Sequence, residues 1–545
     1  MATPTLTTQM TMGQALRRIT EDRPEQESLV CGSLRLTYGQ FQEQVDRAAA
    51  SLGQVGVGHE DRVLFLLPPG VEFVTLFFAA AERGAVAVPL DPRARPQRVS
   101  RVIEQTLPAL LVTREPPPVQ VCETLPEATL LVVTDSSDLS LAGELDSLGV
   151  EEPLPPPEVT PDDLLAILYT SGTTGTPKGA MHAHRSLIAP VVASLKLREL
   201  WSRRPTLDQL PRMGWALMRY RERLLRAAGR PQVFLSTVGF HTVTGIEAFL
   251  QALLMGDTLV IQPYFHPTEA LELIQQERVT VLIAVPTALA IMLRLTDVDQ
   301  YDLSSLLICG TGSAPCPPDL AREVQRRFGC AMHIGFGATE LGGGIAATSL
   351  GDPDDLQAET VGQPMPGIDV RILDEEGEPL PRGEVGELAV RGESVMEGYW
   401  GAPELTEEAV DSEGWYHTGD LAVMDEQGYL RIVGRKKDVI IRGGRSIYPT
   451  EVERQLAAHP DIREVAVLGI PSELGGEEVW AFVIPEEGAK LSPHDVREKG
   501  RGTLETYEIP QVVRFVEDFP RSSTGKPQKF RLRQMALEQL GEEDR

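Results

Sequence analysis

Short apolar runs alternate with helical segments along much of this chain, and this alternation limits the fold more than any other feature. Near the beginning, Thr37 and Gln40 have the spacing of a helix capping box, and an apolar helical face follows them. Apolar runs at 62–67 and 85–89 flank a further helix predicted at 73–82. Because parallel strands need helical crossovers between them, we expect a large N-terminal domain of parallel-rich α/β sheets.

The texture of the sequence changes from about residue 359 onward. Gly and Pro punctuate short strands there, which favours a small β-rich subdomain. From about residue 438, helix signals are mixed with strands, which indicates a small α+β domain at the C-terminal end. The strands predicted in these two parts lie at 369–373, 386–391, 429–433, 464–469 and 479–484.

Composition excludes several classes of function. The chain has 545 residues and a formal net charge of -28, which argues against nucleic-acid binding because Lys and Arg are what hold a phosphate backbone. Its five cysteines are scattered without paired metal-ligand spacing, which suits a reducing compartment. The polar, Thr-rich beginning lacks the pattern of a secretory signal, and no apolar stretch is long enough to span a bilayer. We therefore expect a cytoplasmic protein with no nucleic-acid partner.

The strongest motif follows an apolar strand predicted at 164–168 and reads Tyr169-Thr-Ser-Gly-Thr-Thr-Gly-Thr-Pro-Lys178-Gly179. Glycines let backbone amides approach a polyanion, hydroxyls add donors, and Lys178 adds positive charge, which together suit a triphosphate. It is not a Walker A loop, because Gly179 stands where that motif has Ser or Thr. A flexible surface turn explains such a loop equally well when it stands alone. The residues expected to hold the nucleotide here are Thr170, Ser171, Gly172, Thr173, Thr174, Gly175 and Lys178.

A second motif offers an aromatic face, a hydroxyl and a carboxylate within six residues. It reads Gly335-Phe336-Gly337-Ala338-Thr339-Glu340. These groups suit the stacking of a base, contact with a phosphate and the binding of a hard cation. By itself, the run is also consistent with an ordinary loop between a strand and a helix.

Two further motifs lie in the last third of the chain. Asp420, in the run Thr-Gly-Asp, and Arg435, in the run Gly-Arg-Lys-Lys-Asp, are suited to share the hydroxyls of a ribose. Lys526 follows Gly525 in a turn near the end, from which it can act as a mobile point charge. The alternative for Asp420 and Arg435 is a structural pair, and the alternative for Lys526 is a solvated surface lysine.

These four motifs, in this order, resemble the signatures of the adenylate-forming superfamily. That superfamily comprises acyl-CoA synthetases, aryl-CoA ligases, firefly luciferase and the adenylation domains of peptide synthetases. The resemblance covers nearly the whole chain. It implies an N-terminal domain over 1–434, a hinge over 435–437 with Lys437 at the pivot, and a mobile C-terminal lid domain over 438–545.

The resemblance also implies the roles of several residues in the first half-reaction. Lys526 is expected to bridge the attacking carboxylate and the α-phosphate of ATP, as a catalytic residue. Glu340 and Thr174 are expected at the Mg²⁺ site, with Thr174 and Thr339 in contact with phosphates. Phe336 takes the place of the Tyr that often lies against adenine in relatives.

Further roles concern the ribose, the thiol and the acid. Asp420 and Arg435 are expected to hold the ribose, and the loop at Gly443 and Gly444 to open a path for the pantetheine of CoA. His241 matches a position beside the acyl carboxylate in relatives, although a packed structural histidine is the alternative. The remaining residues of the implied binding set are Gly312, Ser313, Ala314, Pro315, Gly335, Gly337 and Ala338.

The implied activity is ATP-dependent ligation of a carboxylic acid to CoA through an acyl-adenylate. Amino-acid-activating relatives usually carry an Asp near His241, and the stretch 237–241 has none, which favours a fatty, alicyclic or aromatic acid. One alternative is an acyl-AMP ligase that loads an acyl carrier protein. Another is a non-catalytic protein that binds an acyl nucleotide.

The segment 196–230 departs from the pattern of most relatives. It carries ten basic residues against three acidic ones, and its leucines have helical spacing, although Pro211 is expected to interrupt the helix. A basic amphipathic helix can lie on an anionic inner-membrane surface or dock an acidic acyl carrier protein. The alternative is a helix packed on its own domain with solvated arginines. A homodimer is a further open prediction.

Overall fold

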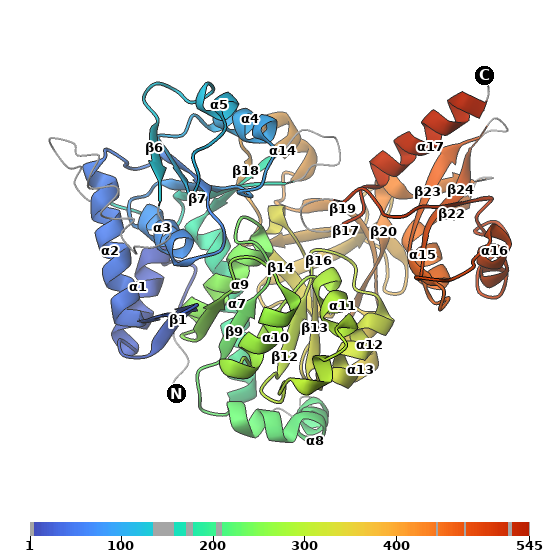
Figure 1. Cartoon of the computed structure of the whole chain (residues 1–545), viewed down its shortest axis with the longest axis horizontal. Helices are drawn as coiled ribbons and strands as arrows, with labels where there is room; N and C mark the ends of the chain where they lie inside the picture. The colour runs from blue at the N-terminus through green and yellow to red at the C-terminus, as the bar shows by residue number, and fades with distance from the viewer. Residues whose placement is uncertain are drawn as a thin grey trace. The chain divides into compact units, whose positions relative to one another are not determined.

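The computed structural model describes residues 5–134, 157–170, 178–202, 210–442, 445–472, 476–521 and 526–543. The chain divides into two compact units. The first contains residues 1–369 and 391–416, and the second contains residues 370–390 and 417–545. Each unit has its own sheets and its own buried core (Figure 1).

A seven-stranded sheet in the first unit carries the strand that leads into the Gly/Thr loop. Its strands, in spatial order, are β18 (Gly398–Tyr399), β8 (Gly179–Ala183), β7 (Leu164–Tyr169), β4 (Val86–Pro89), β3 (Arg62–Leu66), β5 (Leu110–Thr113) and β6 (Leu130–Val133). The pairs from β7 to β6 are parallel, whereas β7 with β8 and β8 with β18 are antiparallel. The Gly/Thr loop therefore joins the two strands of an antiparallel pair.

A nine-stranded sheet in the same unit carries the second motif. Its strands, in spatial order, are β15 (Gln363–Pro364), β14 (Gly343–Ala347), β13 (Ala331–Ala338), β12 (Ile308–Thr311), β11 (Val281–Ile283), β9 (Val233–Ser236), β10 (Thr258–Ile261), β1 (Glu27–Cys31) and β2 (Leu34–Thr37). The pairs from β13 to β1 are parallel, and the strands at the two edges are antiparallel. The predicted parallel-rich α/β class is confirmed.

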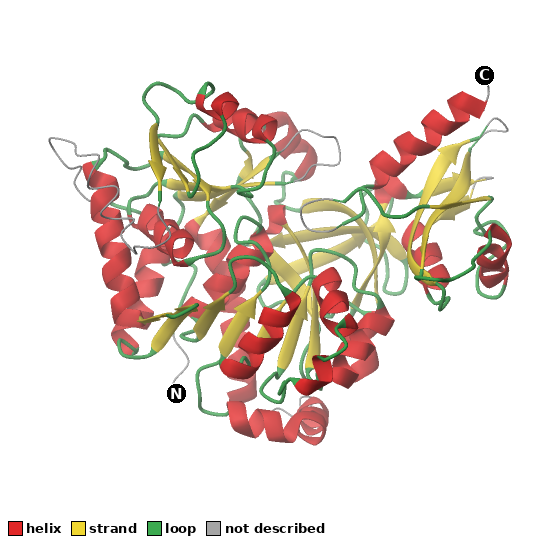
Figure 2. Ribbon diagram, in the orientation of Figure 1, coloured by secondary structure: helices red, strands yellow, loops and turns green. Residues whose placement is uncertain are grey.

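Helices cover these sheets, as the red ribbons of Figure 2 show. The predicted capping box is present, because Thr37 Oγ1 accepts from the Gln40 amide at 3.3 Å and Gln40 Oε1 accepts from the Thr37 amide at 2.9 Å. The helices of the first unit are α1 (Met12–Asp22), α2 (Tyr38–Gln54), α3 (Val71–Glu82), α4 (Pro96–Thr106), α5 (Val119–Cys122), α7 (His184–Ser202), α8 (Leu210–Ala227), α9 (Val243–Leu254), α10 (Pro267–Gln276), α11 (Pro286–Arg294), α12 (Pro318–Arg327), α13 (Asp354–Glu359) and α14 (Pro403–Ala409).

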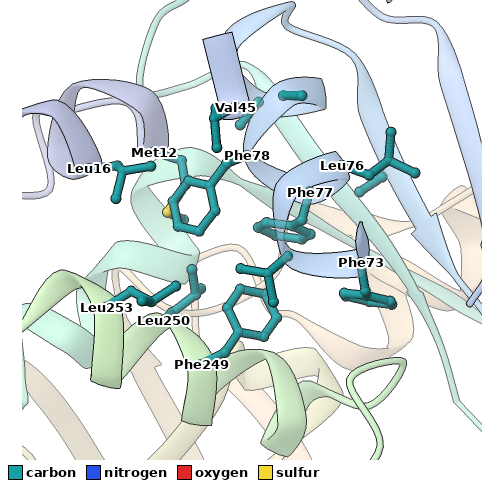
Figure 3. Packing of buried hydrophobic residues seen from close by; sticks show 14 of the residues in the cluster. Met12, Leu16, Val45, Phe73, Leu76, Phe77, Phe78, Phe249, Leu250 and Leu253 are labelled. Carbon is teal, nitrogen blue, oxygen red and sulfur yellow. The ribbon is translucent and has the colours of Figure 1, made fainter. Parts of the chain in front are cut away.

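An aromatic cluster fixes the helices nearest to the functional segments. α3 is apolar on nearly every side, and its Phe73 and Phe77 rings pack edge-on against Phe249 of α9, with centroids 6.2 and 5.3 Å apart (Figure 3). Phe240 joins the cluster at 5.6 Å from Phe73 and 5.2 Å from Phe249. Edge-to-face aromatic pairs add directional stability to burial. The cluster thereby anchors the turn that carries the next residue, His241.

The second unit contains the β-rich part and the C-terminal α+β part. Its elements are a four-stranded sheet of β16 (Ile368–Leu373), β17 (Val385–Gly392), β19 (Tyr416–Met424) and β20 (Leu430–Arg435), the pair β21 (Ile440–Arg442) and β22 (Arg445–Ile447), a three-stranded sheet of β23 (Ile462–Pro471), β24 (Glu477–Pro485) and β25 (Val512–Phe515), and helices α15 (Pro449–Ala457), α16 (Pro493–Arg501) and α17 (Lys529–Glu543). The five strands predicted for this part of the sequence are confirmed to within a few residues.

The basic segment contains helix α8, and the expected interruption at Pro211 stays a prediction. Pro211 is the second described residue of α8, and residues 203–209 before it, with the predicted helical Leu207, lie outside the described residues. The described helix bends at Tyr220, whose φ of -120° and ψ of 18° are not helical. None of the described helices is long and apolar enough to cross a membrane.

Candidate active site

The described ends of the Gly/Thr loop are held together by backbone pairing. The Thr170 amide donates to the Lys178 carbonyl at 2.9 Å, directly beyond the pairing of Tyr169 with Gly179. A Cβ at Gly179 would lie 2.6 Å from Ile167 Cγ2, so only glycine fits there. Five predicted residues of the loop, Ser171, Gly172, Thr173, Thr174 and Gly175, lie outside the described residues.

Lys178 and Glu340 are brought together by a third residue, Tyr399 of β18. The Tyr399 hydroxyl donates to Glu340 Oε1 at 2.9 Å, and the Lys178 ammonium lies 5.1 Å from the centroid of the Tyr399 ring. Burial, reinforced by the Glu340 charge, raises the pKa of Tyr399. The phenol therefore stays protonated and keeps its donor role near neutral pH.

The second motif leaves strand β13 and continues into a short 3-10 turn, η2 (Thr339–Leu341). A Cβ at Gly337 would lie 2.1 Å from the Gly343 carbonyl, so the close pairing of β13 with β14 requires glycine. The Glu340 carbonyl accepts from the Met396 amide at 2.8 Å. Phe336 and Ala338 keep part of their surface accessible, so this edge of the sheet can meet a ligand.

His182 of β8 is buried and forms a hydrogen bond with the turn η2. Its Nε2–H donates to the Thr339 carbonyl at 2.7 Å, while Nδ1 lies 3.2 Å from Ser186 Oγ. Burial lowers the pKa of His182 to about 4, so the imidazole is neutral at physiological pH. The sequence reading missed both His182 and Tyr399. The only local indication of His182 was the pair of histidines, at 182 and 184, directly after the loop.

His241 lies in the first unit with one ring nitrogen available. Its Nε2 is buried without a hydrogen-bond partner among the described residues and lies 3.9 Å from Asp91 Oδ2. Burial lowers the pKa of His241, although Asp91 acts in the opposite direction. A buried ring nitrogen without a protein partner is consistent with a ligand contact and with a packed histidine alike.

The predicted acyl-side segments also meet in the first unit. Ser313 Oγ lies 2.6 Å from Thr244 Oγ1 of α9. A Cβ on Gly312 would lie 3.3 Å from the Gly335 carbonyl, which brings the loop after β12 against the end of β13. The side chains of Ala314 and Pro315 continue the same loop, and both keep accessible surface.

The second unit brings together Asp420, Arg435 and Lys526. Asp420 pairs with Arg435 across β19 and β20, and Arg435 Nε donates to Asp420 Oδ1 at 2.9 Å. Burial raises the pKa of Asp420, and the Arg435 charge opposes that shift. Burial and the Arg435 charge lower the pKa of Lys526, whereas Asp420 raises it, so the three charges lie within range of one another.

The other predicted residues of the second unit are only partly described. Lys437 lies in the 3-10 turn η3 (Lys436–Asp438) that follows β20. Gly443 and Gly444 lie outside the described residues, as does Gly525. The turn that contains Lys437 directly follows Arg435, so the ribose pair and the predicted pivot belong to one continuous segment.

A parallel-rich α/β unit with a Gly/Thr loop beside a carboxylate, together with a separate unit that carries an Asp–Arg pair and a lysine, defines an adenylate-forming enzyme. Residues 16–400 match the AMP-binding enzyme family, and residues 451–526 match the AMP-binding enzyme C-terminal domain. The chain therefore belongs to the family of AMP-binding enzymes.

Three known proteins are similar to this chain over most of its length. The human medium-chain acyl-CoA ligase ACSF2, mitochondrial, is 31% identical, with 96% of this chain and 87% of that protein covered. A feruloyl-CoA synthase from an Amycolatopsis species is 34% identical, with 92% and 94% covered. The ATP-bound crystal structure of MatB from Rhodopseudomonas palustris superposes with a TM-score of 0.82 at 27% identity, with 96% and 99% covered.

These relatives confirm the predicted superfamily and the predicted fold. They also confirm the predicted class of activity, an AMP-forming acid–thiol ligase of the acyl-CoA synthetase kind, which uses ATP and CoA. The roles of single residues are proposals.

Proposed function

We propose that this protein activates a fatty or aromatic carboxylic acid with ATP, releases pyrophosphate, and then transfers the acyl group from AMP to CoA. One observation carries the proposal. A carboxylate, Glu340, and a cation, Lys178, are held on one aromatic side chain beside the described ends of the Gly/Thr loop. This pair of opposite charges suits a nucleotide triphosphate with its counter-ion.

The residues fit a magnesium ion that arrives with the nucleotide. Among the described residues, no group of three or more His, Cys, Asp or Glu side chains is placed to hold a metal by itself. Mg²⁺ is commonly bound through one or two carboxylates and the phosphates of the substrate, and Glu340 offers such a carboxylate, with Thr174 predicted to join it. When bound, Mg²⁺ neutralises charge on the phosphates.

In the first half-reaction, an oxygen of the acid carboxylate attacks the α-phosphorus of ATP, and the bond to the pyrophosphate oxygen breaks. His241 Nε2 is available to orient the attacking carboxylate. Lys526 stabilises the charge that develops at the α-phosphate. Phe336 lies against adenine, and the Asp420–Arg435 pair, joined at 2.9 Å, holds the ribose hydroxyls.

In the second half-reaction, the CoA thiol loses its proton and its sulfur attacks the acyl carbonyl carbon. The bond to the AMP oxygen breaks, and AMP leaves as a good leaving group. Glycines at 443 and 444 suit the close passage of the pantetheine arm, because glycine carries no side chain. The pivot at Lys437 and the predicted domain boundaries around it belong to this proposal.

The experiment measures each half-reaction with a panel of acids. ATP–pyrophosphate exchange is assayed with C6 to C12 fatty acids and with benzoic and cinnamic acids, followed by thioester formation with CoA or a phosphopantetheinyl carrier protein. Exchange with a subset of acids and acyl-CoA as product support the proposal. Transfer to the carrier alone would favour the acyl-AMP ligase, and nucleotide binding without exchange would favour a non-catalytic protein.

Contact with an anionic membrane surface through the segment 196–230 belongs to the same proposal, as do a cytoplasmic location and a homodimer. The arrangement of α8 supports the membrane contact in an unexpected way. Its arginines contact the protein itself: Arg219 Nε lies 3.2 Å from Asp354 Oδ2, and Arg223 donates to the Phe328 carbonyl at 2.9 Å. The outward face carries Leu210, Leu217 and Met218 instead, with 48, 51 and 72% of each side chain exposed.

A further inference from the structure

Glu247 places a partly buried carboxyl group in the first unit, on helix α9. Its Oε1 accepts from Gln251 Nε2 at 3.0 Å, and its Oε2 accepts from the Gly344 amide at 3.1 Å. A Cβ at Gly343 would lie 2.9 Å from the carboxylate, so the glycines of β14 leave the space that this group occupies. The carboxyl group is therefore accommodated by the backbone opposite it.

The surroundings of Glu247 do not neutralise its charge. No Lys or Arg forms an ion pair with it within the part of the chain that the structure describes. The neighbouring residues of α9, Ile246, Ala248 and Phe249, are apolar and buried. Burial raises the pKa of Glu247 to about 7. Burial of a carboxyl group without a cation costs free energy. A purely apolar acyl chain would offer Glu247 no hydrogen bond to offset this cost.

Glu247 lies where the proposed acyl-side segments meet. α9 begins directly after His241, and Thr244, one turn before Glu247, contacts Ser313 at 2.6 Å. On its other side, Gly344 pairs with Gly337 of β13, within the second motif. Glu247 also keeps part of its surface accessible. Glu247 therefore lies on α9 one turn beyond the contact with Ser313, against the strand that pairs with the second motif.

We propose that Glu247 selects the substrate by accepting a hydrogen bond from a hydroxyl or amino group that the acid carries away from its carboxyl. This inference rests on the proposed function and narrows its substrate class. Each carboxylate oxygen accepts one bond from the protein, and a carboxylate oxygen has capacity for a second. A second carboxylate on the substrate would be repelled by ionised Glu247, so dicarboxylic acids should be activated less well above pH 7.

The test compares acids that differ by one polar group. The pairs are cinnamic with 2-, 3- or 4-hydroxycinnamic acid, benzoic with 4-aminobenzoic acid, and octanoic with 8-hydroxyoctanoic acid. The measured quantity is the ratio of kcat/KM values in pyrophosphate exchange. For at least one pair, the wild type should favour the substituted acid by about 10-fold or more, because a site built for a hydroxyl rejects the analogue that lacks it.

Two variants and one control complete the test. Glu247→Leu should reduce the ratio to about 1, and Glu247→Gln should give an intermediate ratio because the amide oxygen still accepts. Glu272→Gln, an exposed acid on α10, should retain the wild-type ratio. Wild-type ratios within about 3-fold for every pair, or an unchanged ratio in Glu247→Leu, would overturn the inference. If none of the acids supported pyrophosphate exchange, that result would count against the proposed function instead.

Discussion

The Tyr399 hydroxyl donates a 2.9 Å hydrogen bond to Glu340, while the Lys178 ammonium lies 5.1 Å from the centroid of the same ring. Three segments meet through this side chain: β18 supplies the phenol, η2 the carboxylate, and the residue directly before β8 the lysine. One aromatic residue thus positions both charges that we propose to face the triphosphate. Tyr399 itself acts through these two residues.

Tyr399→Phe should distinguish the effect of the hydroxyl's hydrogen bond from the effect of the aromatic ring. The variant keeps the ring near Lys178 but leaves Glu340 without its donor, and hydrogen bonds to charged groups contribute about 1.5–3 kcal/mol. We expect pyrophosphate exchange to fall about 10- to 100-fold at fixed Mg²⁺, with partial recovery as Mg²⁺ is raised. The control is Tyr264→Phe, which alters a tyrosine that is 53% exposed. An unchanged dependence on both ATP and Mg²⁺ would contradict the assigned role.

Lys526→Ala should slow the first half-reaction far more than the second. Loss of a positioned charge that stabilises a transition state costs about 10²–10³ in rate, so pyrophosphate exchange should fall by this factor. Transfer from synthetic acyl-AMP to CoA should change far less, because Lys526 has no proposed role there. Lys490→Ala, at an exposed lysine of the same unit, serves as the control. Equal losses in both half-reactions would argue for a general structural role.

His182 should make the protein less stable in mild acid. Its folded-state pKa of about 4 lies below the usual 6.5, so the unfolded chain binds the additional proton between these values. The contribution is intact above pH 6.5 and is lost as the pH falls toward 4, to a limit of about 3 kcal/mol. His182→Gln keeps a donor for the Thr339 carbonyl but does not titrate. Its melting temperature should therefore fall less than that of the wild type between pH 7 and pH 5, and parallel decreases would contradict the assignment.

The titration of Glu247 should change the stability of the protein with pH in the opposite direction. Its folded-state pKa is about 7, above the usual 4.5, so the folded protein retains a proton that the unfolded chain has lost. Stability from this group is complete below pH 4.5 and is lost as the pH rises through 7, to a limit of about 3 kcal/mol. Glu247→Gln should therefore melt at a temperature closer to the wild type at pH 5 and above it at pH 8. A difference that is constant with pH would show that the carboxyl does not titrate in this range.

The sequence predicted features that depend on neighbours along the chain. The capping box at Thr37 and the strand at 164–168 were confirmed because caps and apolar runs are local. The apolar run at 306–309 shows the limit of such local signals: Leu306 and Leu307 are buried, yet the strand there is Ile308–Thr311. Burial alone does not define a strand.

Features that depend on distant pairs were missed. His182 meets Thr339 across 157 positions, and Tyr399 meets Glu340 across 59, so no local pattern indicates either contact. The orientation of α8 was also hidden from the sequence. An amphipathic pattern normally predicts that leucines face inward, yet the carbonyls and carboxylates beside this helix receive its arginines.

The outward apolar face of α8 leads to the last prediction. Leu217 and Met218, before the bend at Tyr220, and Leu225, after it, are 51, 72 and 66% exposed. If this face inserts into the interface of an anionic membrane, burying each side chain contributes about 1.5–3 kcal/mol. Replacing all three with Gln should then weaken sedimentation with phosphatidylglycerol vesicles at least 100-fold, as an order-of-magnitude estimate from these burial energies.

A second variant distinguishes insertion from simple charge attraction. Arg221→Gln removes an exposed charge from the same helix and leaves the apolar residues in place, so it should weaken binding only a few-fold, in line with about 1 kcal/mol for one basic residue near an anionic surface. Pyrophosphate exchange by both variants in solution should match the wild type, since α8 contributes no residue to the proposed site. A wild-type protein that stays in the supernatant with these vesicles would exclude the membrane contact.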